Sequence, residues 1–98
     1  MIVTPGTGKT APQIPVTDLH SGWSDMSVDT KMMRYVFPDN LTGLPAITFP
    51  AGYDNQGLPV GMQVMGRPWE ENRLLQIAYA VEQVVDRKLP QLYYRILK

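Results

Sequence analysis

The chain has 98 residues, with nine Lys or Arg and nine Asp or Glu, so its formal net charge is zero. That length suits one domain with a modest core, and the scattered charge lacks the basic patch typical of nucleic-acid binding. The sequence has no cysteine, which excludes disulfides and thiolate sites and fits an intracellular compartment. It shows no secretory signal pattern and no apolar run near the roughly 20 residues that cross a bilayer.

Residues 1–26 predict a strand followed by a long loop. Residues 1–3 are a short apolar run, and the prolines and glycines from Pro5 onward should end it. The loop then shows neither helical nor alternating apolar spacing, and Trp23 is a candidate anchor for it. We therefore expect this segment to lie over a larger body.

Residues 27–43 predict one helix and a turn. We expect the helix over residues 29–40, capped by Ser27 or Asp29 and kinked or ended by Pro38. The helical spacing is carried by the apolar residues Met32, Met33, Val36 and Phe37.

Residues 44–66 predict two buried strands, over residues 46–49 and 58–65. Between them, residues 54–57 (Asp, Asn, Gln, Gly) are typical of a tight turn. Residues 67–98 predict helices, the clearest over residues 69–87, where Arg87 and Lys88 would complement the helix dipole. We expect that helix to cover one face of the sheet, and a last short helix over residues 91–98.

Two short motifs point to chemistry that their surroundings do not support. The run PGTGKT, residues 5–10, resembles the second half of a phosphate-binding loop, but Val3 stands where the first Gly should be. Pro12 and Pro15 also prevent the helix that such a loop needs, so we expect no nucleotide binding. Asn40 begins a glycosylation sequon, yet its position favours a role in ending a helix or bonding to backbone.

His20 is the single histidine, so a His-based triad would pair it with Ser21, Ser24 or Ser27 in a flexible loop. A small self-contained hydrolase built on His20 is therefore a weak alternative. One histidine and dispersed carboxylates give no metal-ligand spacing, and we expect no metal or cofactor.

The run NLTGLPAITFPAGYDNQGLPVGMQVMGRPWEENRLLQIAYAVEQ resembles the C-terminal segment of the amidase signature hydrolases. Upstream, IVTPGTGKTAPQIP is similar to the Thr-Pro-Thr-x-Gly-x-x-Ala-Pro segment of the same enzymes. The stretches MRYVFPDNLTG, GRPW and LYYRIL resemble in particular the plant fatty acid amide hydrolases. The likeness covers almost the whole chain.

This resemblance implies an α/β fold around a mixed sheet, of which residues 1–98 would form a single C-terminal unit. About three strands covered by two or three helices are expected. The family hydrolyses amides with a Lys, Ser, Ser triad, but this chain has no Gly-Gly-Ser-Ser run. None of its lysines, Lys9, Lys31, Lys88 and Lys98, matches the catalytic one, so we expect no catalytic residue here and no activity from the chain alone.

One position bears on substrate class. The glutamine-type amidotransferases of this family carry an acidic residue about seven positions before the conserved Asn, and the matching residue here is Met33. The resemblance thus implies that Met33 lies in the wall of an acyl pocket, where an apolar side chain suits an apolar chain. Ordinary core packing is the alternative.

The resemblance implies a parent enzyme, able to associate with membranes, that hydrolyses N-acylethanolamines or similar lipid amides. Its partners would be the remainder of the amidase domain or a second copy joined through exposed sheet edges. The alternative is a stand-alone, noncatalytic domain that binds a lipid or a protein.

Overall fold

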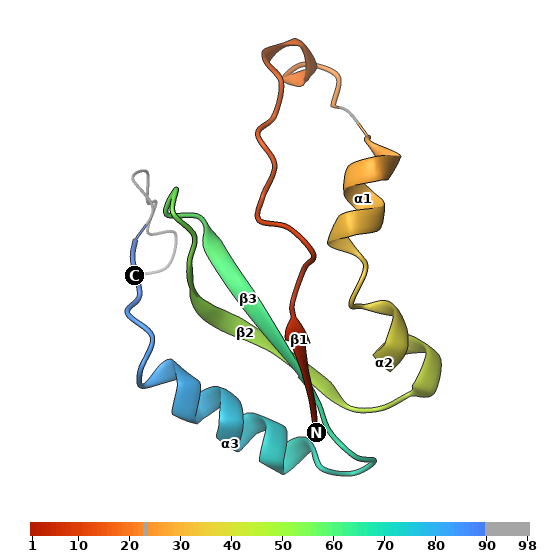
Figure 1. The fold of residues 1–98 in the computed structure, drawn as a ribbon, viewed down its shortest axis with the longest axis vertical. Helices are drawn as coiled ribbons and strands as arrows, with labels where there is room; N and C mark the ends of the chain where they lie inside the picture. Colours follow the sequence, from red (N-terminus) through yellow and green to blue (C-terminus); the bar gives the residue numbers. More distant parts are fainter. Residues whose placement is uncertain (23, 90–98) are drawn as a thin grey trace.

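The computed structural model describes residues 1–22 and 24–89. The elements follow in the order β1 (Ile2–Pro5), the 3-10 turn η1 (Val16–Asp18), α1 (Met26–Met32), α2 (Phe37–Thr42), β2 (Ala46–Tyr53), β3 (Pro59–Met65) and α3 (Glu71–Glu82), as Figure 1 shows. This arrangement confirms the expected small α/β fold. The predictions for Trp23 and for a helix over residues 91–98 lie outside the described residues.

The sheet has the order β1-β3-β2, with β3 in the centre. Both pairings are antiparallel, so the part of the expected mixed sheet that the described residues form is antiparallel. The register places Val3, Val64 and Ile47 in one row across the three strands. The N-terminal strand therefore joins a hairpin that begins more than 40 residues later in the sequence.

The hairpin is longer than the sequence predicted. We expected the first strand to stop at Phe49, but β2 continues to Tyr53 through a bulge between Pro50 and Gly52. Proline is tolerated there because β2 is an edge strand, whose outward N–H groups are not needed for pairing. The predicted turn is confirmed: the Asp54 carboxylate accepts hydrogen bonds from the backbone N–H groups of Gln56 and Leu58 at 2.8 and 2.9 Å.

Helix α3 covers one face of the sheet, as predicted, and the core lies between them. Phe49 of β2, Val64 of β3 and Leu74 of α3 are buried together. The partly buried residues packed around them are Ile47, Met62, Ile77, Ala78 and Val81. The helix is shorter than predicted, since it ends at Glu82, and Arg87 and Lys88 therefore lie beyond its last turn.

The single helix predicted over residues 29–40 is wrong, because the structure has two helices there. Helix α1 begins at Met26, capped by the Asp25 carboxylate, which accepts from the N–H groups of Ser27 and Val28. Its cap is thus neither Ser27 nor Asp29. Pro38 neither kinks nor ends a helix but stands in the first turn of α2, where its missing N–H costs nothing.

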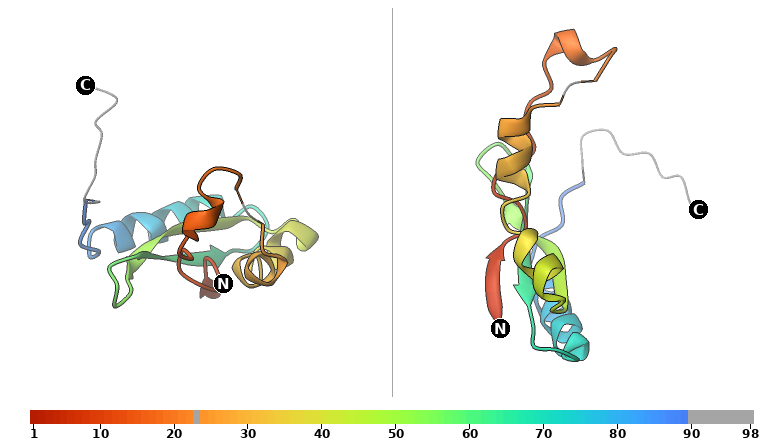
Figure 2. Two further views of the ribbon diagram at one scale, coloured as in Figure 1. Left: turned by 90° about the horizontal axis from the view of Figure 1, so that it is seen from above. Right: turned by 90° about the vertical axis from the view of Figure 1, so that its right-hand side faces the viewer.

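Residues 6–36 form an arm that leaves the end of β1, rises away from the sheet and returns through α1 (Figure 1). Seen from the side, the arm extends well beyond the sheet (Figure 2). The principal extents of 45, 35 and 28 Å reflect this elongated shape. In the described ranges, no helix combines the length and apolar character needed to span a bilayer.

Candidate functional site

The sheet face opposite the core is lined by small and polar residues. Alternate strand residues point to opposite faces, so the partners of the core residues in sequence lie on this other side. Thr4, Gln63 and Thr48 form one row of the register across all three strands. Gly6 and Gly61 continue the face, joined by a hydrogen bond of 2.8 Å from the Gly6 N–H to the Gly61 carbonyl. We call these five residues the polar face.

Gln63 is the buried centre of the polar face, with 3% of its surface exposed. Its side-chain Nε2 donates a hydrogen bond of 3.1 Å to the backbone carbonyl of Tyr35, which lies between α1 and α2. The central strand is thereby tied to the turn formed by residues 33–36. Sequence reasoning missed this residue, although a lone glutamine inside the apolar run PVGMQVM was a visible signal.

A second contact lies two residues before that turn. Gly8, in the segment that leaves β1, packs against the carbonyl end of α1, and a Cβ at this position would overlap the carbonyl oxygen of Lys31. Glycine is therefore required by close approach of two backbones, and not by a special φ angle. The segment after β1 has no helix before η1, in agreement with the rejection of a phosphate-binding loop.

Met33 ends α1 and starts the turn of residues 33–36. Its N–H donates to the Asp29 carbonyl at 2.9 Å, and its own carbonyl accepts from the Val36 N–H at 3.2 Å. The Met33 side chain is 58% exposed and stands outside the core. Its place between Gly8 and Gln63 in the contact pattern is what the structure adds to the sequence.

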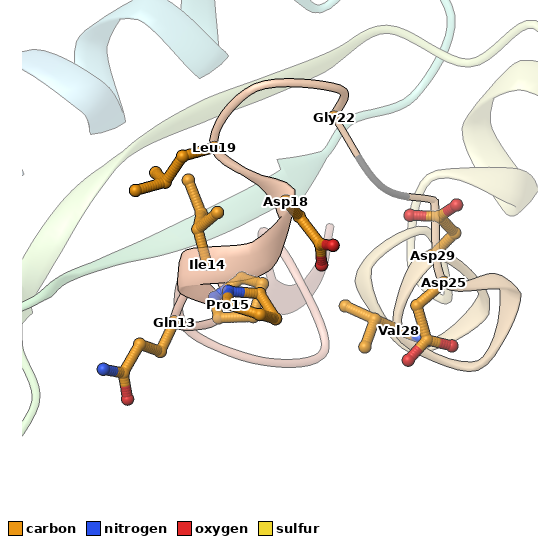
Figure 3. Close-up of a pocket in the computed structure, with 10 residues that line it drawn as sticks. Gln13, Ile14, Pro15, Asp18, Leu19, Gly22, Asp25, Val28 and Asp29 are labelled. Atoms are coloured by element: carbon orange, nitrogen blue, oxygen red, sulfur yellow. The ribbon is translucent and has the colours of Figure 1, made fainter.

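A cavity of about 380 Å³ opens between the loop of residues 12–22 and α1. Figure 3 shows Val28 of α1 pointing toward Pro15 and Asp18 of the loop. Hydrogen bonds from the Ser27 hydroxyl and backbone hold the pKa of the Asp25 carboxyl at its rim below the ordinary value. That carboxylate is occupied with capping α1, and Met33 is not among the lining residues.

His20 and the serines near it are exposed. The Ser27 hydroxyl donates to Asp25 at 2.7 Å and the Ser24 hydroxyl to Asp29 at 3.2 Å, so neither is directed at the histidine. Asn40 lies inside α2 and is exposed, instead of ending a helix. Within the described ranges, no group of three His, Cys, Asp or Glu residues is placed to hold a metal ion.

The amidase family model matches residues 1–75. The chain belongs to the amidase family. It is 52% identical over 99 residues to a fatty acid amide hydrolase of Medicago truncatula and 50% identical over 98 residues to one of Arabidopsis thaliana. Each alignment covers 99% of this chain but 16% of the relative. The amidase chain thus spans about one sixth of these relatives' length.

A shorter match reaches a different branch of the family. A glutamyl-tRNA(Gln) amidotransferase of Dinoroseobacter shibae is 66% identical over 44 residues, which are 45% of this chain and 9% of that relative. The likeness predicted from the sequence, to amidases in general and to the plant hydrolases in particular, is confirmed by these matches.

Proposed function

We propose that this amidase segment is the C-terminal structural part of an enzyme that hydrolyses fatty acid amides of the N-acylethanolamine type. The observation that carries the proposal is the identity of 52% and 50% to two fatty acid amide hydrolases over 99% of the chain. The Ser-Ser-Lys group would lie in the part of the enzyme that this chain does not contain. The segment would supply three sheet strands, the covering helix α3 and the turn that carries Met33.

The exposed apolar surface supports docking on the remainder of the amidase domain. Val3 shares a register row with the buried Val64, yet it is 59% exposed because α3 packs on β2. Met1 and Ile2 beside it are exposed as well. An apolar strand at a sheet edge invites pairing with a further strand, which the remainder of the domain would provide. Self-association through the same edge is the competing outcome.

Met33 would contribute to the wall of the acyl pocket. Its side chain is exposed on the turn of residues 33–36, where it can meet another surface. A thioether adapts to flexible apolar chains, because it is unbranched and polarizable. A carboxylate at the same position would have to lose its hydration next to the acyl chain, which costs more than the contact returns.

A segment exchange tests the proposal. The matching C-terminal segment of the Arabidopsis thaliana enzyme is replaced by this chain, and hydrolysis of a long-chain N-acylethanolamine is measured. We expect kcat/KM within about tenfold of the parent, since most contacts are retained, and a larger loss for the Met33→Asp chimera. The chain alone should hydrolyse nothing, because a nucleophile needs an activating base and an oxyanion hole.

A folded chimera without hydrolysis would contradict the proposal. If the chain alone also remained a stable monomer and bound lipid vesicles or a protein partner, the stand-alone binding domain would replace it. A stable dimer of the chain alone would instead indicate self-association through the edge of β1.

A further inference from the structure

We propose that Gln63 and Gly8 are positioning residues that fix the turn of residues 33–36 on the sheet and so determine which acyl chains the enzyme accepts. The inference rests on the proposed function, because the turn carries Met33. It goes further by assigning chain-length selection to two residues that touch no substrate.

The first step is the cost of burying Gln63. A carboxamide with 3% exposure must be hydrogen-bonded, or its desolvation destabilises the fold. Its Nε2 has its partner in the Tyr35 carbonyl, 28 residues earlier in the chain. Gln63 stands in the central strand, held on both sides by Thr4 and Thr48 of the neighbouring strands. The turn is therefore anchored to the most rigid position of the sheet.

The second step is the contact at the other end of the turn. Gly8 presses against the Lys31 carbonyl, two residues before Met33, whereas Gln63 holds Tyr35, two residues after it. Both contacts are made by segments of the sheet or directly continuous with it. Met33 is thus bracketed by two anchors that come from β1 and β3.

The third step is the weakness of the helices themselves. α1 has seven residues and α2 has six, which is too short for either helix to persist through its own hydrogen bonds. Packing between elements is concentrated within the sheet and between α3 and β2 in the described part of the chain. The placement of the turn therefore depends on the two anchors.

The consequence is a difference between substrates. A long acyl chain contacts the pocket wall along its length, and displacing the wall weakens those contacts. A short acyl chain ends before it gains from them. Loss of an anchor should therefore raise KM for long-chain amides, with little change of kcat for short ones.

The experiment uses the chimera with the Gln63→Leu and Gly8→Ala variants, and Gln76→Leu on the exposed side of α3 as the matched control. Turnover of a long-chain and a short-chain N-acylethanolamine is compared. We expect the long-to-short ratio of kcat/KM to fall about tenfold in both variants through KM, and to stay unchanged in the control. An equal loss for both substrates, or no loss, would overturn the inference.

Amide hydrogen exchange of the same chimeras separates this inference from the proposed function. The Met33 and Val36 N–H groups are bonded within and just before the turn, to Asp29 and Met33, and report on its order. If the unsubstituted chimera hydrolyses no amide, the proposed function fails. Faster exchange at both amides in Gln63→Leu and Gly8→Ala than in Gln76→Leu would still support the anchors, and equal exchange would overturn them.

Discussion

The hydroxyl of Tyr53 accepts a hydrogen bond of 2.7 Å from the backbone N–H of Lys88 and reaches the carbonyl of the same residue at 3.4 Å. The Lys88 ammonium group lies 5.1 Å from the centre of the Tyr53 ring. Residues separated by 35 positions are thereby joined at the end of β2, beyond the last turn of α3. This side chain holds the segment after α3 against the hairpin.

Replacing Tyr53 by Phe removes the hydroxyl but keeps the ring under the ammonium group. We expect exchange of the Lys88 amide to rise about fivefold, equivalent to about 1 kcal/mol for one lost hydrogen bond. The measurement is site-resolved hydrogen exchange. The matched control is Tyr79→Phe, at an exposed position of α3, which should leave the Lys88 amide unchanged. Unaltered Lys88 exchange in Tyr53→Phe would show that the ring contact alone holds this segment.

Leu74 is the residue of α3 that the core depends on. It is buried against Phe49 and Val64, so truncation to Ala leaves a cavity between helix and sheet. We expect a loss of about 2 to 5 kcal/mol in the free energy of unfolding, measured by urea denaturation. Leu75→Ala, next to it but exposed, should change that free energy by less than about 0.5 kcal/mol. Equal effects of the two substitutions would place α3 differently from the structure.

The hairpin and α3 could be predicted from the sequence because local signals specify them. A turn sequence between two runs rich in β-branched residues and a long apolar stripe need no knowledge of distant contacts. Their ends were less predictable: β2 continues past Pro50 because an edge strand tolerates proline and a bulge absorbs the irregularity. That tolerance depends on the strand order, which the sequence does not display.

The region around Met33 could not be predicted for a related reason. The stripe of Met32, Met33, Val36 and Phe37 indicates one amphipathic helix, but Met33 and Phe37 remain exposed in the structure. What divides the helix is a turn held from outside by Gln63 and Gly8, in contacts across 28 and 23 positions of sequence. Pro38 is compatible with both arrangements, since it can end one helix or begin another.

The Asp54 carboxylate should make the hairpin sensitive to acid. Hydrogen bonds from backbone N–H groups, first that of Leu58, lower its pKa below 3.8. Because the folded-state pKa is lowered, the stabilisation is complete above about 3.8 and is lost as the pH falls through the lower folded-state value. We expect a carboxyl NMR titration of Asp54 with its midpoint below 3.8.

The Asp54→Asn variant tests the origin of that sensitivity. It should weaken amide protection in the hairpin at neutral pH and remove the change seen on acidification. Asp86→Asn, an exposed substitution after α3, is the control and should keep both. A hairpin that loses protection with acid to the same extent in Asp54→Asn would place the responsible group elsewhere.

Trp69 combines backbone strain with exposure. It has φ of 67°, the one non-glycine residue with positive φ in the described ranges, and its surface is 91% exposed. The left-handed conformation costs roughly 1 kcal/mol or more for a side chain with a Cβ, and this side chain gains little packing in return. It also delays the start of α3 from the predicted residue 69 to Glu71.

We therefore expect Trp69→Gly to raise the free energy of unfolding of the chain by about 1 kcal/mol, whereas Trp69→Phe, which keeps the Cβ, leaves it unchanged. Urea denaturation measures both. In the chimera the same glycine substitution should lower stability if the remainder of the amidase domain covers the indole, because buried apolar surface is then lost. A gain of equal size in the chain and in the chimera would show that Trp69 stays exposed in the whole enzyme.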